Sequence, residues 1–151
     1  MSIQARYVHT NLIARDWRSL ARFYQDVFGC VPVPPERDYF GDDLDRGTGV
    51  RGARLAGMHL RLPGVGADGP TLEVFQYSPP SASSEPSIHR PGFGHIAFSV
   101  PDVQAARAEV LASGGCPVGE VVTLSLPTGE EVEWCYVADP EGNGIELQTW
   151  L

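Results

Sequence analysis

The sequence predicts an α+β fold built from two tandem copies of one βαβββ module, and three repeated features support this prediction. His9 opens the segment HTNLIARDWRSLARFYQDVFGC, and His95 opens the equally long segment HIAFSVPDVQAARAEVLASGGC. An aspartate follows each histidine at the same spacing, and a Gly-Cys pair closes each segment. Each copy then ends in a strand-like run with one glutamate, TLEVFQY in the first copy and GIELQTW in the second. Such internal similarity is typical of a duplicated structural unit.

In the first copy, residues 5–13 alternate in polarity and predict a strand in which His9 and Asn11 share one face. Asp16 is expected to cap a helix by accepting hydrogen bonds from free backbone amides, because apolar residues recur after it at helical spacing. Gly29 is expected to end that helix. The rest of the copy is predicted as a proline-rich and acidic loop at 30–45, a strand in the last part of 46–61, a turn at 64–70 and a strand at 71–77.

The second copy repeats this order of elements. Its first strand carries His95, Ala97 and Ser99 on one face. Asp102 is expected to cap the following helix, and the pair Gly114-Gly115 is expected to end it. Further strands are predicted at 121–126, at 132–137 and in the closing run GIELQTW.

The whole chain is expected to form one domain over residues 1–151, with module one at 1–78, a linker at 79–91 and module two at 92–151. A chain of 151 residues has the size of a single domain and can bury most of its apolar surface. The linker is rich in proline and serine and poor in apolar residues, which is typical of a connecting segment.

Charge and composition exclude some classes of function. A formal net charge of −8 disfavours a nucleic-acid surface, which needs clustered cations to displace counterions from phosphates. All 11 basic residues are arginine, so a Schiff base on a lysine side chain is excluded. We therefore do not expect a nucleic acid as a partner.

The cysteines and the N-terminal residues predict a cytoplasmic location. Three cysteines without a C-x-x-C spacing are typical of reduced thiols, and Cys30 and Cys116 are expected to be small core residues. The first residues lack the pattern of a signal peptide, and no apolar stretch is long enough to cross a membrane.

Four residues with metal-binding side chains occupy matching positions of the two copies: His9 and Glu73 in the first, His95 and Glu146 in the second. A single histidine or glutamate in a strand is usually a core or surface residue, but ionisable groups on inward strand faces are seldom buried without a partner. Two imidazoles and two carboxylates suit one divalent ion such as Zn, Ni, Co, Mn or Fe. We therefore predict a metal site on these four residues, with positions left open for water or a substrate oxygen.

Other polar and aromatic residues are left outside the predicted site. His59 and His89 are excluded because histidines in exposed loops and strands are common. The arginines between Arg46 and Arg61 are expected to be mainly solvated, with contact to an anionic thiol conjugate or acyl-CoA as the alternative. Trp134 and Tyr136 share a strand face and either line the site or fill the core.

The chain resembles the vicinal oxygen chelate superfamily, which includes glyoxalase I, methylmalonyl-CoA epimerase, fosfomycin-resistance enzymes, extradiol dioxygenases and bleomycin-binding proteins. The resemblance covers nearly all of the chain and rests on HTNLIARDWRSLARFYQDVFGC, TLEVFQYSP, GFGHIAFSVPDV and YVADPEGNGIELQTW. It implies a glyoxalase-like fold in which paired βαβββ modules form a cupped mixed sheet, and a homodimer. It also implies that a metal ion lies on the residues matching His9, Glu73, His95 and Glu146.

The pattern is closest to members that resemble glyoxalase I and methylmalonyl-CoA epimerase, because Glu73 stands where those proteins use a second acidic or amide ligand. The resemblance implies a divalent-metal-dependent lyase or isomerase that chelates vicinal substrate oxygens and transfers a proton through an enediolate. Glu73 or Glu146 would be the catalytic base. Two alternatives stay open: a non-catalytic small-molecule binding or resistance protein, and an Fe(II)-dependent extradiol-type dioxygenase.

Overall fold

The computed structural model describes residues 3–82 and 84–151, and its contacts divide the chain into two compact units, Met1–Ala82 and Ser83–Leu151. The division falls inside the segment predicted as a linker, 79–91. Each unit contains a mixed sheet and at least one helix, which confirms the predicted α+β fold of two tandem modules. That the two units together form one domain over 1–151 stays a prediction.

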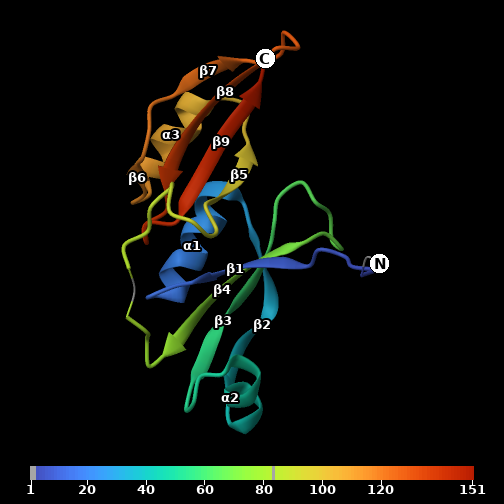
Figure 1. Ribbon diagram of the computed structural model, residues 1–151, viewed down its shortest axis with the longest axis vertical. Helices are drawn as coiled ribbons and strands as arrows, with labels where there is room; N and C mark the ends of the chain where they lie inside the picture. Colours follow the sequence, from blue (N-terminus) through green and yellow to red (C-terminus); the bar gives the residue numbers. More distant parts are fainter. Residues whose placement is uncertain (1–2, 83) are drawn as a thin grey trace. The chain divides into compact units, whose positions relative to one another are not determined.

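The first unit has, among its described residues, a four-stranded sheet and two helices (Figure 1). The strands lie in the order β1-β4-β3-β2, in which β1 runs parallel to β4 and the other neighbours are antiparallel. The elements are β1 (His9–Ile13), α1 (Trp17–Phe28), β2 (Val31–Phe40), α2 (Asp42–Thr48), β3 (Arg54–Arg61) and β4 (Thr71–Ser78). Apart from α2, this is the predicted βαβββ order.

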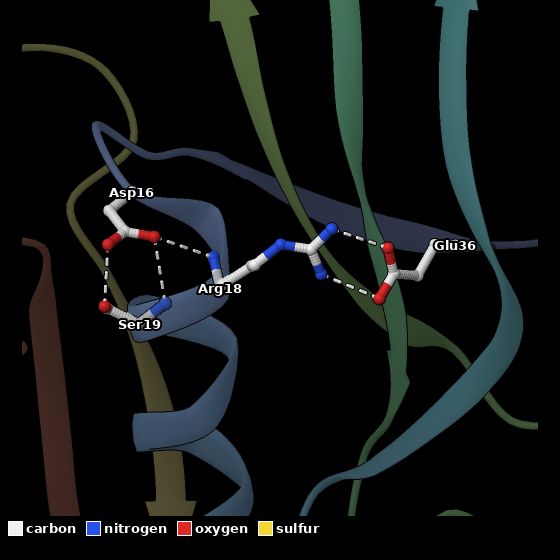
Figure 2. Close-up of polar contacts among 4 residues, drawn as sticks. All are labelled: Asp16, Arg18, Ser19 and Glu36. Atoms are coloured by element: carbon white, nitrogen blue, oxygen red, sulfur yellow. Dashed lines mark hydrogen bonds and ion pairs between the residues drawn. The ribbon is translucent and has the colours of Figure 1, made fainter.

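Helix α1 begins and ends at the residues that the sequence predicts. The carboxylate of Asp16 accepts hydrogen bonds from the amides of Arg18 and Ser19, two of the donors that a helix start leaves free (Figure 2). The Ser19 hydroxyl also donates to it, and these bonds lower the pKa of Asp16. Gly29 ends the helix with a φ of 67°, a left-handed conformation that glycine adopts without strain. The apolar side of α1 packs on β3 and β4 through Trp17, Leu20, Ala21, Phe23 and Tyr24.

The predicted loop at 30–45 is wrong over most of its length, because β2 and the start of α2 occupy it. Its prolines are compatible with a strand here because, among the described strands, β2 is the last of its sheet and pairs with β3 alone. A shift of register between Val33 and Arg37 further removes the intervening residues from the ladder. Three aspartates in the first turn of α2 favour a helix start, because carboxylates interact well with the N-terminal end of a helix.

An exposed ion pair connects α1 to β2. The Arg18 guanidinium donates two parallel hydrogen bonds, of 2.7 and 2.8 Å, to the two oxygens of Glu36 (Figure 2). This bidentate geometry lowers the pKa of Glu36, while the Arg18 guanidinium also lies over the Trp17 ring. Because both side chains are more than half exposed, the pair orients β2 without adding much stability.

The second unit has, among its described residues, a five-stranded sheet and one helix (Figure 1). The main strand order is β5-β9-β8-β6, in which β5 runs parallel to β9, and β7 also pairs with β8. The elements are β5 (His95–Ser99), α3 (Val103–Ala112), β6 (Cys116–Pro117), β7 (Val122–Ser125), β8 (Glu131–Ala138) and β9 (Gly144–Trp150). The short strand β6 is an addition to the elements that the sequence predicts.

Helix α3, like α1, begins after an aspartate whose side chain caps it. Asp102 accepts a hydrogen bond of 2.8 Å from the amide of Ala105, as predicted for its cap. The helix ends at Ala112, just before the predicted Gly114-Gly115. At Gly115 a Cβ atom would lie 2.6 Å from the Ala138 carbonyl oxygen, so only glycine fits the close approach of this turn to β8.

One of the two cysteines expected in the core is buried and the other is exposed. Cys30 is buried, and burial raises the pKa of its thiol to about 11, so it is an unreactive core residue as predicted. Cys116 is exposed on β6, so its predicted place in the core is wrong. In 3–82 and 84–151, no helix is both long and apolar enough to cross a membrane.

Candidate functional site

Glu73 lies on β4 between Leu72 and Val74, two side chains with almost no exposure. Successive residues of a strand face opposite sides of the sheet, so Leu72 and Val74 belong to the buried apolar face and Glu73 points to the other. Glu73 is nevertheless only 9% exposed. A carboxylate removed from water to this extent requires polar partners.

Three side chains of the first unit supply those partners. Asn11 of β1 and His59 of β3 stand directly opposite Glu73 on its two neighbouring strands, so all three share one face. Asn11 Nδ2 donates to Glu73 Oε2 at 3.1 Å, and His9 Nε2 lies 3.2 Å from the same oxygen. His59 Nε2 lies 2.9 Å from Glu73 Oε1, a close nitrogen–oxygen contact. Both oxygens of Glu73 are therefore engaged.

His59 is the histidine of this cluster that the sequence analysis excluded from the predicted site, and Asn11 was likewise not assigned to it. Its side chain is 23% exposed, and its ring packs edge-on against Phe75 with 5.7 Å between ring centroids. Burial lowers the pKa of His59 below its ordinary value, and the Glu73 carboxylate opposes this shift only in part. The imidazole is therefore neutral at pH 7, with one ring nitrogen as a donor and the other as an acceptor.

The second unit repeats the first pair. Glu146 lies on β9 between the fully buried Ile145 and Leu147, and it faces away from them. His95 Nε2 of β5 lies 3.0 Å from Glu146 Oε2. Among the residues that the structure describes, His95 is the one hydrogen-bonding or ion-pairing partner of Glu146.

Two aromatic rings lie on the same sheet face as Glu146. Tyr136 of β8 stands directly opposite Glu146, and its ring centroid lies 4.9 Å from those of both His95 and Trp134. Of the two roles left open for Trp134 and Tyr136, the register thus favours lining the face of the candidate site. Burial, with a smaller effect of the Glu146 charge, raises the pKa of Tyr136, so its phenol stays neutral at pH 7.

The two pairs occupy the same register position in the two sheets. In the first unit, β1 and β4 are parallel and Asn11, two residues after His9, pairs with Glu73. In the second, β5 and β9 are parallel and Ala97, two residues after His95, pairs with Glu146. The sequence repeat therefore extends to a repeat of geometry, with each histidine set diagonally across a parallel strand pair from its glutamate.

The predicted ligands are thus brought together as two pairs, His9 with Glu73 and His95 with Glu146. Within 3–82 and 84–151, no group of three or more His, Cys, Asp or Glu side chains is arranged to hold a metal ion. Each pair by itself fits an ion, because two ligand atoms on one Zn²⁺ would lie about 3.0–3.4 Å apart, given bond lengths near 2.1 Å. The binding of one ion by all four residues stays a prediction.

The contacts of His89 and of three of the arginines between Arg46 and Arg61 show which of them lie near the candidate site. His89 is exposed in the segment between the modules, where its Nδ1 lies 3.0 Å from the Ser87 hydroxyl. Arg46 forms an ion pair with Asp43, and Arg54 forms one with Asp38, so neither guanidinium is free for an anionic ligand. Arg61 differs in its position. Arg61 and His9 stand opposite Thr71 on the two strands that flank β4, so Arg61 shares the sheet face of the candidate site.

Comparisons with known proteins bear on the family and the fold of the chain. The family model of the Glyoxalase/Bleomycin resistance protein/Dioxygenase superfamily matches residues 6–147. A glyoxalase family protein from Bacillus cereus is similar in structure, with a TM-score of 0.76 and 18% identity over 100% of this chain and 96% of that one. A glyoxylase/bleomycin resistance protein/dioxygenase domain from Frankia sp. EAN1pec has a TM-score of 0.63 and 16% identity, over 99% and 100% of the two chains.

A glyoxalase/bleomycin resistance protein/dioxygenase family enzyme from Burkholderia phytofirmans PsJN has a TM-score of 0.58 and 15% identity, over 97% of this chain and 100% of that one. At these identities the likeness establishes the fold alone. No curated protein matches the chain in sequence. Because the family model covers almost the whole sequence, the chain belongs to the Glyoxalase/Bleomycin resistance protein/Dioxygenase superfamily.

Proposed function

We propose that the protein is a divalent-metal-dependent lyase or isomerase of glyoxalase type that acts on a small molecule with two adjacent oxygens. The ligands would be His9, Glu73, His95 and Glu146. The observation that carries this proposal is the repeat of one histidine–glutamate pair at one register position in both sheets, with nitrogen–oxygen distances of 3.2 and 3.0 Å. A divalent ion held there would withdraw charge from the substrate oxygens and make a neighbouring C–H bond more acidic.

The two glutamates are expected to have different roles, because their surroundings differ. Glu73 is contacted by three side chains, which engage both of its oxygens. Glu146 has His95 as its polar partner among the described residues, and its second oxygen has none. A catalytic base must have a carboxylate oxygen that can turn toward the substrate proton, accept it and later release it, which an oxygen without a polar partner can do. We therefore assign proton transfer to Glu146 and ion binding without proton transfer to Glu73.

Metal content tests the proposal directly. The purified chain, stripped with a chelator and then reloaded with Zn²⁺, Ni²⁺, Co²⁺, Mn²⁺ or Fe²⁺ in turn, is expected to retain one ion per chain in elemental analysis. The loaded protein is then expected to turn over a methylglyoxal–thiol hemiacetal or methylmalonyl-CoA. A folded chain that retains no ion overturns the proposal. Saturable ligand binding that a chelator does not affect would point instead to a binding or resistance protein, and oxygen consumption with ring cleavage to a dioxygenase.

We also propose a homodimer, which rests on the resemblance to family members that pair modules across a subunit boundary. Terminal strands such as β2 have unpaired backbone groups that a second copy would cover. Sedimentation equilibrium at micromolar concentration is expected to give twice the mass of 16.4 kDa. A monomeric mass at that concentration would contradict the dimer without affecting the assignment of the ligands.

A further inference from the structure

The Glu73 carboxylate is approached at its two oxygens by different side chains. His9 and Asn11 reach Oε2, and His59 reaches Oε1. The proposed ligation uses the oxygen next to His9, because those two atoms are separated as two ligands of one ion would be. The oxygen next to His59 is then left over. The contact of this oxygen with His59 determines whether the Glu73 carboxylate can rotate or tilt away from the ion.

The sheet holds His59 in place for this contact. His59 and Glu73 are direct partners in the antiparallel pair of β3 and β4, so their side chains leave the sheet side by side. The Phe75 ring, two residues beyond Glu73 on β4, packs against the imidazole. A ring fixed in this way loses little further freedom when it donates a hydrogen bond.

The described residues of the second unit form no equivalent of this contact. Tyr136 takes the place of His59, because it stands opposite Glu146 on the strand that corresponds to β3. Its ring packs against His95, and within the described residues its hydroxyl forms no hydrogen bond with Glu146. The histidine is therefore a specific addition to one half of a repeated site, where it contacts the glutamate that does not transfer the proton in our proposal.

We propose that His59 is a positioning residue, which fixes the Glu73 carboxylate by donating its Nε2–H to Oε1 and so presents Oε2 for metal binding. The inference rests on the proposed function, because it requires Glu73 to be a ligand. His59 itself is not a ligand in this proposal, since its nitrogen faces the oxygen that His9 does not contact. Residues that orient a ligand in this way typically change metal affinity by about 10–100-fold when they are replaced.

The test compares four forms of the full chain: wild type, His59→Phe, His59→Gln and His89→Ala. Phenylalanine keeps a ring against Phe75 but removes the donor, whereas glutamine restores an N–H near the position of Nε2. His89 is an exposed histidine and serves as the matched control. The Co²⁺ dissociation constant is measured by competition with a chelator, and the visible absorption spectrum of bound Co²⁺ reports the ligand geometry.

The His59→Phe variant is expected to bind Co²⁺ about 10–100-fold more weakly than wild type and to change the visible spectrum. The His59→Gln variant should recover most of the affinity, and His89→Ala should match wild type. Wild-type affinity and spectrum in His59→Phe would overturn the inference and leave the proposed function intact. A failure of glutamine to restore binding would also overturn it, because His59 would then act through a bond to the ion. A wild-type chain that binds no Co²⁺ overturns the proposed function itself.

A second measurement needs neither metal nor a stable variant at position 59. In the ion-free protein, the long-range ¹⁵N–¹H spectrum of His59 is expected to show the tautomer protonated at Nε2. The signal should shift when Glu73 is replaced by glutamine, because the acceptor then loses its charge. An imidazole protonated at Nδ1 instead would overturn the inference, since such a ring cannot donate to Oε1.

Discussion

Replacement of Glu146 by glutamine is expected to slow proton exchange at the substrate carbon by about 10²–10⁴-fold, the usual contribution of a general base. An amide oxygen can still bind a metal ion, but it cannot accept a proton at neutral pH. The variant should therefore keep its ion and its fold while losing the chemical step. Deuterium incorporation from D₂O, followed by NMR on the substrate that the wild type turns over, measures this rate.

The matched control is Glu73→Gln. It changes the same functional group at the repeated position, but on the carboxylate that three neighbours hold in place. We expect it to weaken metal binding and to leave most of the exchange rate per bound ion. A larger loss of exchange in Glu73→Gln than in Glu146→Gln would reverse the assignment of roles. Wild-type exchange in both variants would show that neither glutamate is the base.

Replacement of His9 or His95 by alanine is expected to weaken metal binding by more than the roughly 10–100-fold typical of supporting residues, because each change removes a proposed ligand. The imidazoles are partly exposed, with side chains 42% and 31% accessible, so neither change empties the core. Isothermal titration with Zn²⁺ gives the dissociation constants, and circular dichroism confirms the fold.

His89→Ala is the control for these two variants, since it removes an exposed imidazole that lies outside β1 and β5. It should bind Zn²⁺ as wild type does. Equal losses in all three variants would mean that Zn²⁺ is bound without regard to the repeat. A loss in only one of the two ligand variants would place the ion on a single unit.

The repeat in the sequence was sufficient to predict the parts of the fold that both copies share. It placed the two caps at Asp16 and Asp102, and it aligned each first strand with a last strand that carries a glutamate. These predictions succeeded because capping depends on a few adjacent residues and strand faces depend on simple alternation. Capping and strand alternation are local properties, and the same pattern in both copies strengthens the prediction for each.

Segments without a counterpart in the other copy were harder to predict. Strand β2 contains prolines, which argue against a strand unless it lies at the end of a sheet and pairs on one side only. That position is set by the order of strands in space, which local composition does not reveal. The exposure of Cys116 was also not predicted. Cys116 lies on β6, a strand of only two residues that leaves its side chain accessible.

His59 was missed because its role depends on cross-strand register. Gly66 stands midway in the sequence between His59 and Glu73, so a hairpin that turns about Gly66 sets the two residues opposite each other. That symmetry was a usable signal. The turn at 64–70 allowed several registers, however, and a shift of one residue would move His59 to the other face of the sheet.

The two members of each pair are carried by strands with different numbers of neighbours. Glu73 and Glu146 are on β4 and β9, which are hydrogen-bonded on both sides, whereas His9 and His95 are on β1 and β5, which pair on one side only in the described sheets. Strands with one partner open more often than strands with two, because fewer hydrogen bonds must break. The lifetime of a bound ion would then be governed by the fraying of β1 and β5. The glutamates would fix where the ion sits, and the histidines would set how long it stays.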